Sequence, residues 1–268
     1  MNHILTCTSE ELALMVSLSG YDSVAKGIAE AAIGKKTEQE WIAIMEATSK
    51  QLIMKRILDE ERDARGENPL TEEMLHFIKN YVESKRMIRC SNTPAQSVLM
   101  IHHYENDDWL LHLIEKDIIH EFSIISSDEM DSYMKEYYGI QKLHTIEHRS
   151  FILSEKNFDR LSNPDKLKKV RKSSNFTPEE EISFELFTED LRRFDWTLFN
   201  ISNFGIVSLE DEMYLENILF FLPSTQGIWL SEYSDDTETI HFHLADEKEW
   251  EDMLRSIGEF ASHLVEQE

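Results

Sequence analysis

Residues 98–129 read VLMIHHYENDDWLLHLIEKDIIHEFSIISSDE, and this stretch decides the fold. A first apolar run ends in the polar turn 105–108, a second begins with Trp109, and a third is centred on Phe122. Short runs of strand-favouring residues separated by polar turns are typical of β-hairpins. Ser126 and Glu129 then have the spacing of a capping box, which begins a helix. The stretch therefore predicts three antiparallel strands followed by a helix.

The same pattern recurs 120 residues later, without a gap, in residues 218–249. The shift places Trp109 on Trp229 and Phe122 on Phe242. Self-similarity at a fixed offset is the mark of a repeated structural unit. We therefore expect the two halves to superpose, with the two tryptophans in equivalent positions.

Helix signals upstream extend the correspondence. Thr37 and Thr177 each begin a capping box, and Asp246 begins another before the last helix. Short apolar strands are expected at 4–6 and 151–153. The number of residues between Thr37 and Thr177 is larger than the shift of 120 that relates the later segments. The difference predicts one extra helix in the first half.

Together these patterns predict an α+β fold with two quasi-symmetric halves and an antiparallel sheet flanked by helices. The first α+β repeat is expected in residues 1–148, with its extra helix near 70–84, and the second in residues 149–268. The two repeats are expected to join into one globular unit.

Composition limits the classes of function. The chain has 268 residues, with 52 Asp and Glu against 27 Lys and Arg, and a net charge of −25. Nucleic acids and anionic membranes need a basic surface, so the charge argues against both and favours a protein partner. One basic run, residues 166–172, is interpreted as a solvated loop, with contact to a polyanion as the alternative.

Cysteines and apolar segments indicate a cytoplasmic location. Cys7 and Cys90 lie 83 residues apart, which provides neither a disulfide framework nor the spacing of a zinc site. We find no signal-peptide pattern at the start and no apolar stretch long enough to cross a membrane. Both cysteines are expected to be reduced thiols.

Catalytic motifs receive little support. His144 to His148 match the H-x-x-E-H pattern of some zinc proteases, but no amphipathic helix or third ligand accompanies them, so we interpret the segment as a linker. His102, His103, His241 and His243 are expected to be ordinary strand histidines, either exposed or hydrogen-bonded. Glycine-rich phosphate loops and a nucleophile elbow are missing from the sequence. We therefore expect no enzyme activity, no cofactor and no metal.

The layout resembles the EspG-type chaperones of type VII (ESX) secretion and their Gram-positive relatives. The resemblance rests on the paired segments 98–138 and 218–260 and on the opening 8–15, TSEELALM. It implies a cytosolic protein that holds a helical secretion substrate soluble for type VII export. No binding residue is carried over from the family.

Two other functions stay open. An acidic immunity protein that blocks the basic site of a toxin would fit the charge equally well. Residues 37–114 could also be read as a winged-helix regulator with a sensor domain, in which 71–92 would contain the recognition helix. Its charges are balanced, with Lys and Arg offset by Glu, which disfavours phosphate contact.

The two hairpin turns are the candidate protein-binding sites, because turns tolerate divergence that packed strands do not. The first turn is acidic and the second is neutral. The candidate residues are Asn106, Asp107, Asp108, Ser224, Thr225 and Gln226.

Overall fold

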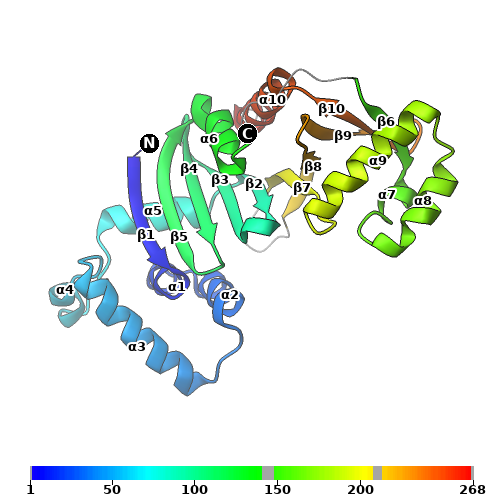
Figure 1. Cartoon of the computed structure of the whole chain (residues 1–268). Helices are drawn as coiled ribbons and strands as arrows, with labels where there is room; N and C mark the ends of the chain where they lie inside the picture. Colours follow the sequence, from blue (N-terminus) through cyan, green and yellow to red (C-terminus); the bar gives the residue numbers. More distant parts are fainter. Residues whose placement is uncertain (1, 141–147, 208–212, 267–268) are drawn as a thin grey trace. The chain divides into compact units, whose positions relative to one another are not determined.

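The computed structural model describes residues 2–140, 148–207 and 213–266 (Figure 1). Its strands are β1 (Asn2–Thr8), β2 (Arg86–Asn92), β3 (Ser97–Glu105), β4 (Asp108–Glu115), β5 (Ile119–Ser126), β6 (Ser150–Ser154), β7 (Phe199–Gly205), β8 (Tyr214–Pro223), β9 (Ile228–Ser234) and β10 (Thr239–Ala245). The α-helices are α1 (Ser9–Leu18), α2 (Asp22–Ile33), α3 (Glu38–Met54), α4 (Glu60–Ala64), α5 (Glu72–Val82), α6 (Met130–Tyr138), α7 (Glu155–Phe158), α8 (Leu167–Ser174), α9 (Pro178–Arg193) and α10 (Glu247–Glu266). Short 3₁₀ turns occupy Thr93–Ala95, Ser127–Glu129 and Pro164–Lys166.

The strands are hydrogen-bonded in the order β1-β5-β4-β3-β2-β7-β8-β9-β10-β6. The pairs β1·β5, β5·β4, β4·β3, β8·β9, β9·β10 and β10·β6 are all antiparallel. The predicted α+β class with an antiparallel sheet is therefore confirmed. A helix does lie near 70–84, namely α5, and its status as the extra helix of the first half stays a prediction.

Two compact units divide the chain. Unit 1 consists of 1–88, 96–127 and 204–214, and unit 2 consists of 89–95, 128–203 and 215–268. Residues 89–95 thus belong to unit 2 although they lie within the sequence of unit 1, and residues 204–214 belong to unit 1 although they lie within the sequence of unit 2. The assignment of 1–148 and 149–268 as two repeats stays a prediction.

In unit 1, α5 covers one face of the sheet β1-β5-β4-β3. The ring centroids of Phe77 in α5 and Phe122 in β5 lie 5.2 Å apart. Leu110 in β4 and Leu5 in β1 belong to the same buried cluster. The turn from β4 to β5 consists of residues 116–118, with φ values of 52° at Lys116 and 57° at Asp117, and the Ile118 amide donates to the Glu115 carbonyl at 3.0 Å.

Three helices follow β1 in the same unit. Thr8 caps α1 by a complete capping box with Glu11, whose side chain is buried and ion-paired with Lys55 at 2.7 Å. Both α2 and α3 pack against α1. These helices bury Leu12, Val16 and other apolar side chains of α1, which places the core at one end of the β1–β5 pair.

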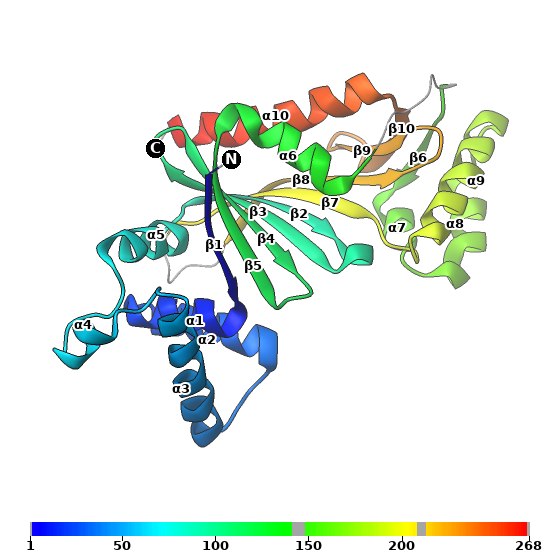
Figure 2. The ribbon, with the colours of Figure 1, turned by 60° about the vertical axis from the view of Figure 1, so that its left-hand side comes forward.

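In unit 2, helices lie on both faces of the strands. On one face, Phe151 of β6 stacks on Phe242 of β10 at 5.0 Å, and Phe187 of α9 packs on Phe242 at 4.9 Å. On the other face, Phe221 of β8 packs on Trp250 of α10 at 4.8 Å. Figure 2 shows α6 and α10 running side by side over that face. Aromatic side chains therefore form the core of unit 2 on both sides of its strands.

Three of the four predicted helix caps form. The capping boxes at Thr37 and Thr177 are complete, and the Asp246 carboxylate accepts the Glu249 amide at 2.9 Å. The capping box predicted at Ser126 is wrong. The ladder of β5 continues through Ser126, which pairs with Asp108, and a 3₁₀ turn separates it from α6.

The strand register corrects the predicted equivalence of the two tryptophans. Phe122 and Phe242 do occupy corresponding positions, opposite Leu5 and Phe151 on the neighbouring strands. Trp109, however, pairs with Ile125, on the face opposite to Phe122. Neighbouring residues in a strand point to opposite faces.

Trp229 lies on the same face as Phe242, because it pairs with Leu244. The residue of β4 that corresponds to it is Leu110, which pairs with Ile124. The cause is the turn that follows the tryptophan strand: three residues separate Glu115 of β4 from its β5 partner Ile119, whereas four residues separate Ser234 of β9 from its β10 partner Thr239. A one-residue slip moves every side chain to the other face, so equivalence residue by residue fails here, and the symmetry of the halves stays a prediction.

Candidate functional site

The turn between β3 and β4 carries the acidic half of the predicted binding residues. Asn106, Asp107 and Asp108 are all exposed. Asn106 has a φ of 51°, and its carbonyl oxygen lies 3.1 Å from His103 Nε2. The Ser127 hydroxyl donates to the Asp107 carboxylate. This turn therefore presents two carboxylates and an amide to solvent from a constrained backbone.

The turn between β8 and β9 carries the neutral half. The Ser224 amide donates to the Gly227 carbonyl at 2.9 Å, and the Gln226 amide lies 3.3 Å from Ser224 Oγ. The side chains of Thr225 and Gln226 are exposed. Their exposure leaves them available to a partner, and their role in binding stays a prediction.

Four of the five residues of the H-x-x-E-H segment lie outside the described residues. The fifth, His148, has an exposed side chain. His241 and His243 share a face of β10. His241 lies 3.2 Å from the Thr239 hydroxyl, and His243 lies 2.7 Å from the Glu249 carboxylate. Within residues 2–140, 148–207 and 213–266, no three His, Cys, Asp or Glu side chains are placed to hold a metal ion.

A histidine cluster in unit 1 was missed by the sequence analysis. It consists of His102, His112 and His120, which are all buried between the sheet and α5. His112 Nε2 lies 2.8 Å from His120 Nδ1, and the ring of Tyr81 packs edge-on against His102 at 5.3 Å. The prediction of ordinary strand histidines is wrong for His102, because α5 covers the face to which it points.

Burial keeps the three rings uncharged at neutral pH. Burial lowers the pKa of His102 and of His120 to about 4, in the second case against the nearby carboxylates of Asp117 and Glu10. Burial and the two neighbouring rings lower the pKa of His112 well below its ordinary value. His102 Nε2 and His112 Nδ1 are buried without a hydrogen-bond partner among the described residues. The cluster is therefore packed as an aromatic core and responds to acid.

Neither cysteine is disposed to act as a nucleophile. Both are free and buried, as expected for reduced thiols. Burial raises the pKa of Cys7 and of Cys90 to about 12. Because the thiolate is the reactive form, these two side chains are inert at neutral pH.

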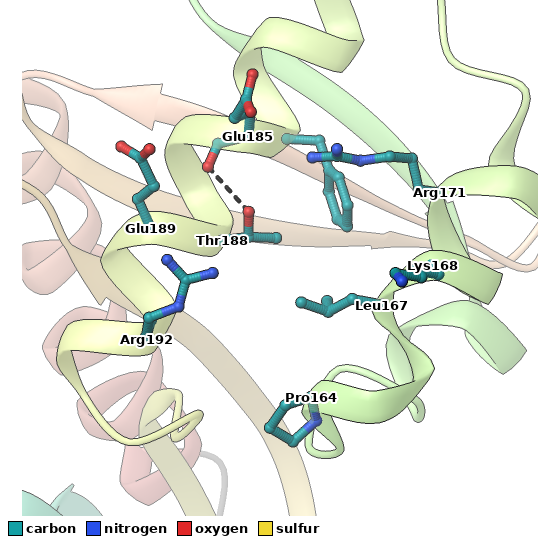
Figure 3. A pocket seen from close by; sticks show the side chains of 9 residues that line it. Pro164, Leu167, Lys168, Arg171, Glu185, Thr188, Glu189 and Arg192 are labelled. Carbon is teal, nitrogen blue, oxygen red and sulfur yellow. Dashed lines mark hydrogen bonds between the residues drawn. The ribbon is translucent and has the colours of Figure 1, made fainter.

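A pocket with a volume of about 360 Å³ lies between α8 and α9 in unit 2 (Figure 3). Figure 3 shows the side chains of α8 and α9 facing one another across it, with Leu167 pointing from α8 toward α9. Phe184, which is fully buried, also lines the pocket. The lining residues are Pro164, Leu167, Lys168, Arg171, Phe184, Glu185, Thr188, Glu189 and Arg192.

Charged groups of both signs line the same pocket. Arg171 Nε lies 2.7 Å from the Glu181 carboxylate, and its guanidinium lies 5.9 Å from the centre of the Phe184 ring. Thr188 donates its hydroxyl to the Glu185 carbonyl at 2.9 Å. Lys168 forms no ion pair with any described residue. The pocket can therefore accept an apolar group beside an anionic one.

The helix α8 corrects the interpretation of residues 166–172 as a solvated loop. Val170, in the middle of the run, is completely buried and anchors the helix. Lys and Arg are good helix formers, and Asn163 caps the preceding turn through its side chain. The spacing of Leu167 and Val170 was the available signal, but five cations in seven residues obscured it.

Among the helices in the described part of the chain, none combines the length and the apolar character that a membrane crossing requires.

Comparison with known proteins places the fold. The model of a family described as the uncharacterised protein YfjC matches residues 10–257. The chain is also similar to the Mycobacterium tuberculosis type VII secretion system chaperone EspG5, in the structure of its complex with the PE25–PPE41 dimer. That match has a TM-score of 0.55 and 8% identity, and it covers 96% of this chain and 95% of that one. The comparison with curated proteins finds no match. The resemblance to the EspG fold, expected from the repeated pattern, is confirmed.

Proposed function

We propose that this chain, which belongs to the family of the uncharacterised protein YfjC, binds a protein partner as a chaperone or adaptor. The observation that carries the proposal is the likeness in fold, over nearly the whole of both chains, to the secretion chaperone EspG5. Because a fold alone does not determine a function, the charge and the surface of the chain supply the rest of the support.

The partner that fits best is a helical secretion substrate, which the chain would hold soluble in the cytosol for type VII export. EspG5 is a chaperone of such a system and was seen bound to the PE25–PPE41 dimer. The net charge of −25 favours a protein partner over a polyanion. The exposed side of α5 carries Glu72, Glu73 and Glu83 beside Lys79, which further disfavours a winged-helix contact with DNA.

The hairpin turns are the proposed contact surfaces. Asp107 and Asp108 project from a turn in which His103 contacts the Asn106 carbonyl and the Ser127 hydroxyl donates to the Asp107 carboxylate, so the turn can meet a partner with little further ordering. Ser224, Thr225 and Gln226 offer amides and hydroxyls without charge. Polar groups of this kind are typical of the rim of a protein interface.

Co-expression tests the proposal. The probes are whatever small W-x-G helical-hairpin proteins the genome of the source organism encodes, each produced alone and together with this chain. We expect the soluble fraction of one of them to rise in the presence of the chain and the two to co-elute as a stoichiometric complex. If every such protein is equally soluble and monomeric with and without the chain, the chaperone function is wrong.

Charge reversal tests the contact surface. Replacing Asp107 and Asp108 together by Lys should weaken the complex more than tenfold, about 1.4 kcal/mol, with little change in thermal stability. The matched control replaces the exposed pair Asp235 and Asp236 in the β9–β10 turn by Lys, with the same change in net charge. The control should bind as tightly as the wild type. If the Asp107/Asp108 double variant and Gln226→Lys also bind that tightly, the turns are not the contact surface.

The same complex separates the proposal from an immunity function. Both functions need a protein partner, but an immunity protein would abolish the activity of a toxin at equimolar concentration. If the bound partner is a toxin whose catalysis is blocked, the acidic surface belongs to an inhibitor and the chaperone proposal fails.

A further inference from the structure

Helix α8 carries a concentration of positive charge that the rest of the chain lacks. Residues 166–172 contain five Lys and Arg in seven positions, in a chain with almost twice as many acidic as basic residues. Among these five, only Arg171 is ion-paired with a described residue, at 2.7 Å from Glu181. Unpaired cations on an acidic protein create a local field that attracts an anionic group.

The pocket beside this helix combines that field with an apolar lining. Leu167, Pro164 and the buried Phe184 provide that lining. Lys168 lines the pocket, whereas Lys169 and Lys172 of the same helix do not. A volume of about 360 Å³ is at the small end of the range for ligand sites. It suits one or two side chains rather than a large cofactor.

The distribution of charge around the pocket selects the kind of ligand. Lys168 and Arg171 project from α8, whereas Glu185 and Glu189 project from α9, with Arg192 one turn further on (Figure 3). A polyphosphate or a nucleic acid would bring negative groups against both glutamates, which costs binding energy. A peptide can present a carboxylate to α8 and its backbone amides to α9.

We propose that the α8–α9 pocket binds a peptide segment in which a carboxylate stands next to a large aliphatic side chain. The carboxylate lies against Lys168, and the aliphatic side chain enters between Leu167 and Phe184. The inference deepens the proposed function and rests on it, because such a segment would belong to the protein partner. It adds a second contact, of opposite charge to the acidic β3–β4 turn.

Fluorescence anisotropy with defined peptides tests the site on the full-length chain. The first probe is a fluorescein-labelled hexapeptide that alternates leucine with glutamate. The second has glutamine for glutamate, the third has serine for leucine, and inorganic tripolyphosphate is the competitor. We expect the first probe to bind at least tenfold more tightly than the second or the third. Tripolyphosphate should displace it only weakly.

Matched variants then locate the site. Lys168→Glu should weaken binding of the first probe at least tenfold, and Lys168→Arg should retain it. Lys169→Glu makes the same change in net charge on the same helix, at a position that does not line the pocket, and should change binding less than threefold. Equal losses in Lys168→Glu and Lys169→Glu would show non-specific attraction and overturn the inference.

The results also separate this inference from the proposed function. If the first probe binds the wild-type chain no better than its glutamine counterpart does, the pocket does not recognise carboxylates. This result does not depend on whether the variants fold. If a client complex forms and Lys168→Glu binds that client as tightly as the wild type, the chaperone function stands and the pocket contact is wrong. If the peptide binds as expected but no client complex forms, the site is real and the chaperone function is wrong.

Discussion

Acidification should destabilise the fold through the histidine cluster, well before most carboxylates are protonated. An unfolded chain exposes its histidines, with a pKa of about 6.5, whereas burial lowers the pKa of His102 in the folded chain to about 4. Between these values the unfolded chain binds more protons than the folded one, so the free energy of unfolding increases with pH. The contribution is complete above about pH 6.5 and is lost as the pH falls toward 4.

The magnitude follows from the size of the pKa difference. Each pKa unit corresponds to about 1.36 kcal/mol, so His102 accounts for about 3 kcal/mol of stability lost by about pH 4. His120, with a pKa of about 4, should contribute a similar amount. Domains of this kind are stable by about 5–15 kcal/mol, so the loss is a large part of the total. Cys7 nearby stays protonated throughout, because burial raises its pKa to about 12, and burial raises the pKa of Tyr81 still further above this range.

Urea denaturation at a series of pH values between about 4.5 and 7.5 measures the effect. His102→Leu removes one titrating ring together with a buried nitrogen that has no described partner, so its stability at neutral pH should lie within about 1 kcal/mol of the wild type. At about pH 4.5 it should lose about 2 kcal/mol less than the wild type. His103→Leu, on the same strand but outside the cluster, is the control. If the wild type and His102→Leu lose the same stability on acidification, the buried rings are not the cause.

Three further predictions follow from single contacts. Gly205→Ala would place a methyl group in the ring of Tyr214 and should lower the free energy of unfolding by about 1–3 kcal/mol. Thermal denaturation should show full recovery of that stability when Tyr214 is also replaced by Ala, and no recovery would mean that the ring is not the obstacle. Thr177→Ala removes the cap of α9 and should lower the unfolding free energy by about 1 kcal/mol, whereas Thr225→Ala in an exposed turn should be neutral; equal effects would contradict the capping role. Elemental analysis of the purified chain should find no stoichiometric metal, and zinc that disappears in His148→Ala would show that the H-x-x-E-H segment is a metal site.

The hairpins and the capped helices were predictable because their signals are local. A polar turn between apolar runs specifies a hairpin whatever the rest of the chain does, and the boxes at Thr37 and Thr177 satisfy helix amides within four residues. The helix cap predicted at Ser126 failed because a 3₁₀ turn over Ser127–Glu129 comes first, so that α6 begins only at Met130 and its N-cap residue is Glu129.

Contacts between distant segments decided the candidate sites. The burial of His102 depends on α5, which is contributed by residues 72–82 and packs through Tyr81. The pocket depends on the approach of α8 to α9. The basic run by itself does not indicate a helix, because its one anchoring side chain, Val170, is recognised only by its burial. Neither juxtaposition is encoded in a spacing along the chain.

The sequence by itself determined the class of fold, the acidic character and the repeated strand–strand–strand–helix pattern, because these depend on composition and on short periodicities. Only the tertiary structure decided on which face of the sheet Trp109 lies and which segments each unit takes from the other's stretch of sequence. The physical reason is that strand register depends on turn length. A β4–β5 turn that is one residue shorter than the β9–β10 turn is enough to carry Trp109 to the face opposite the one that Trp229 occupies.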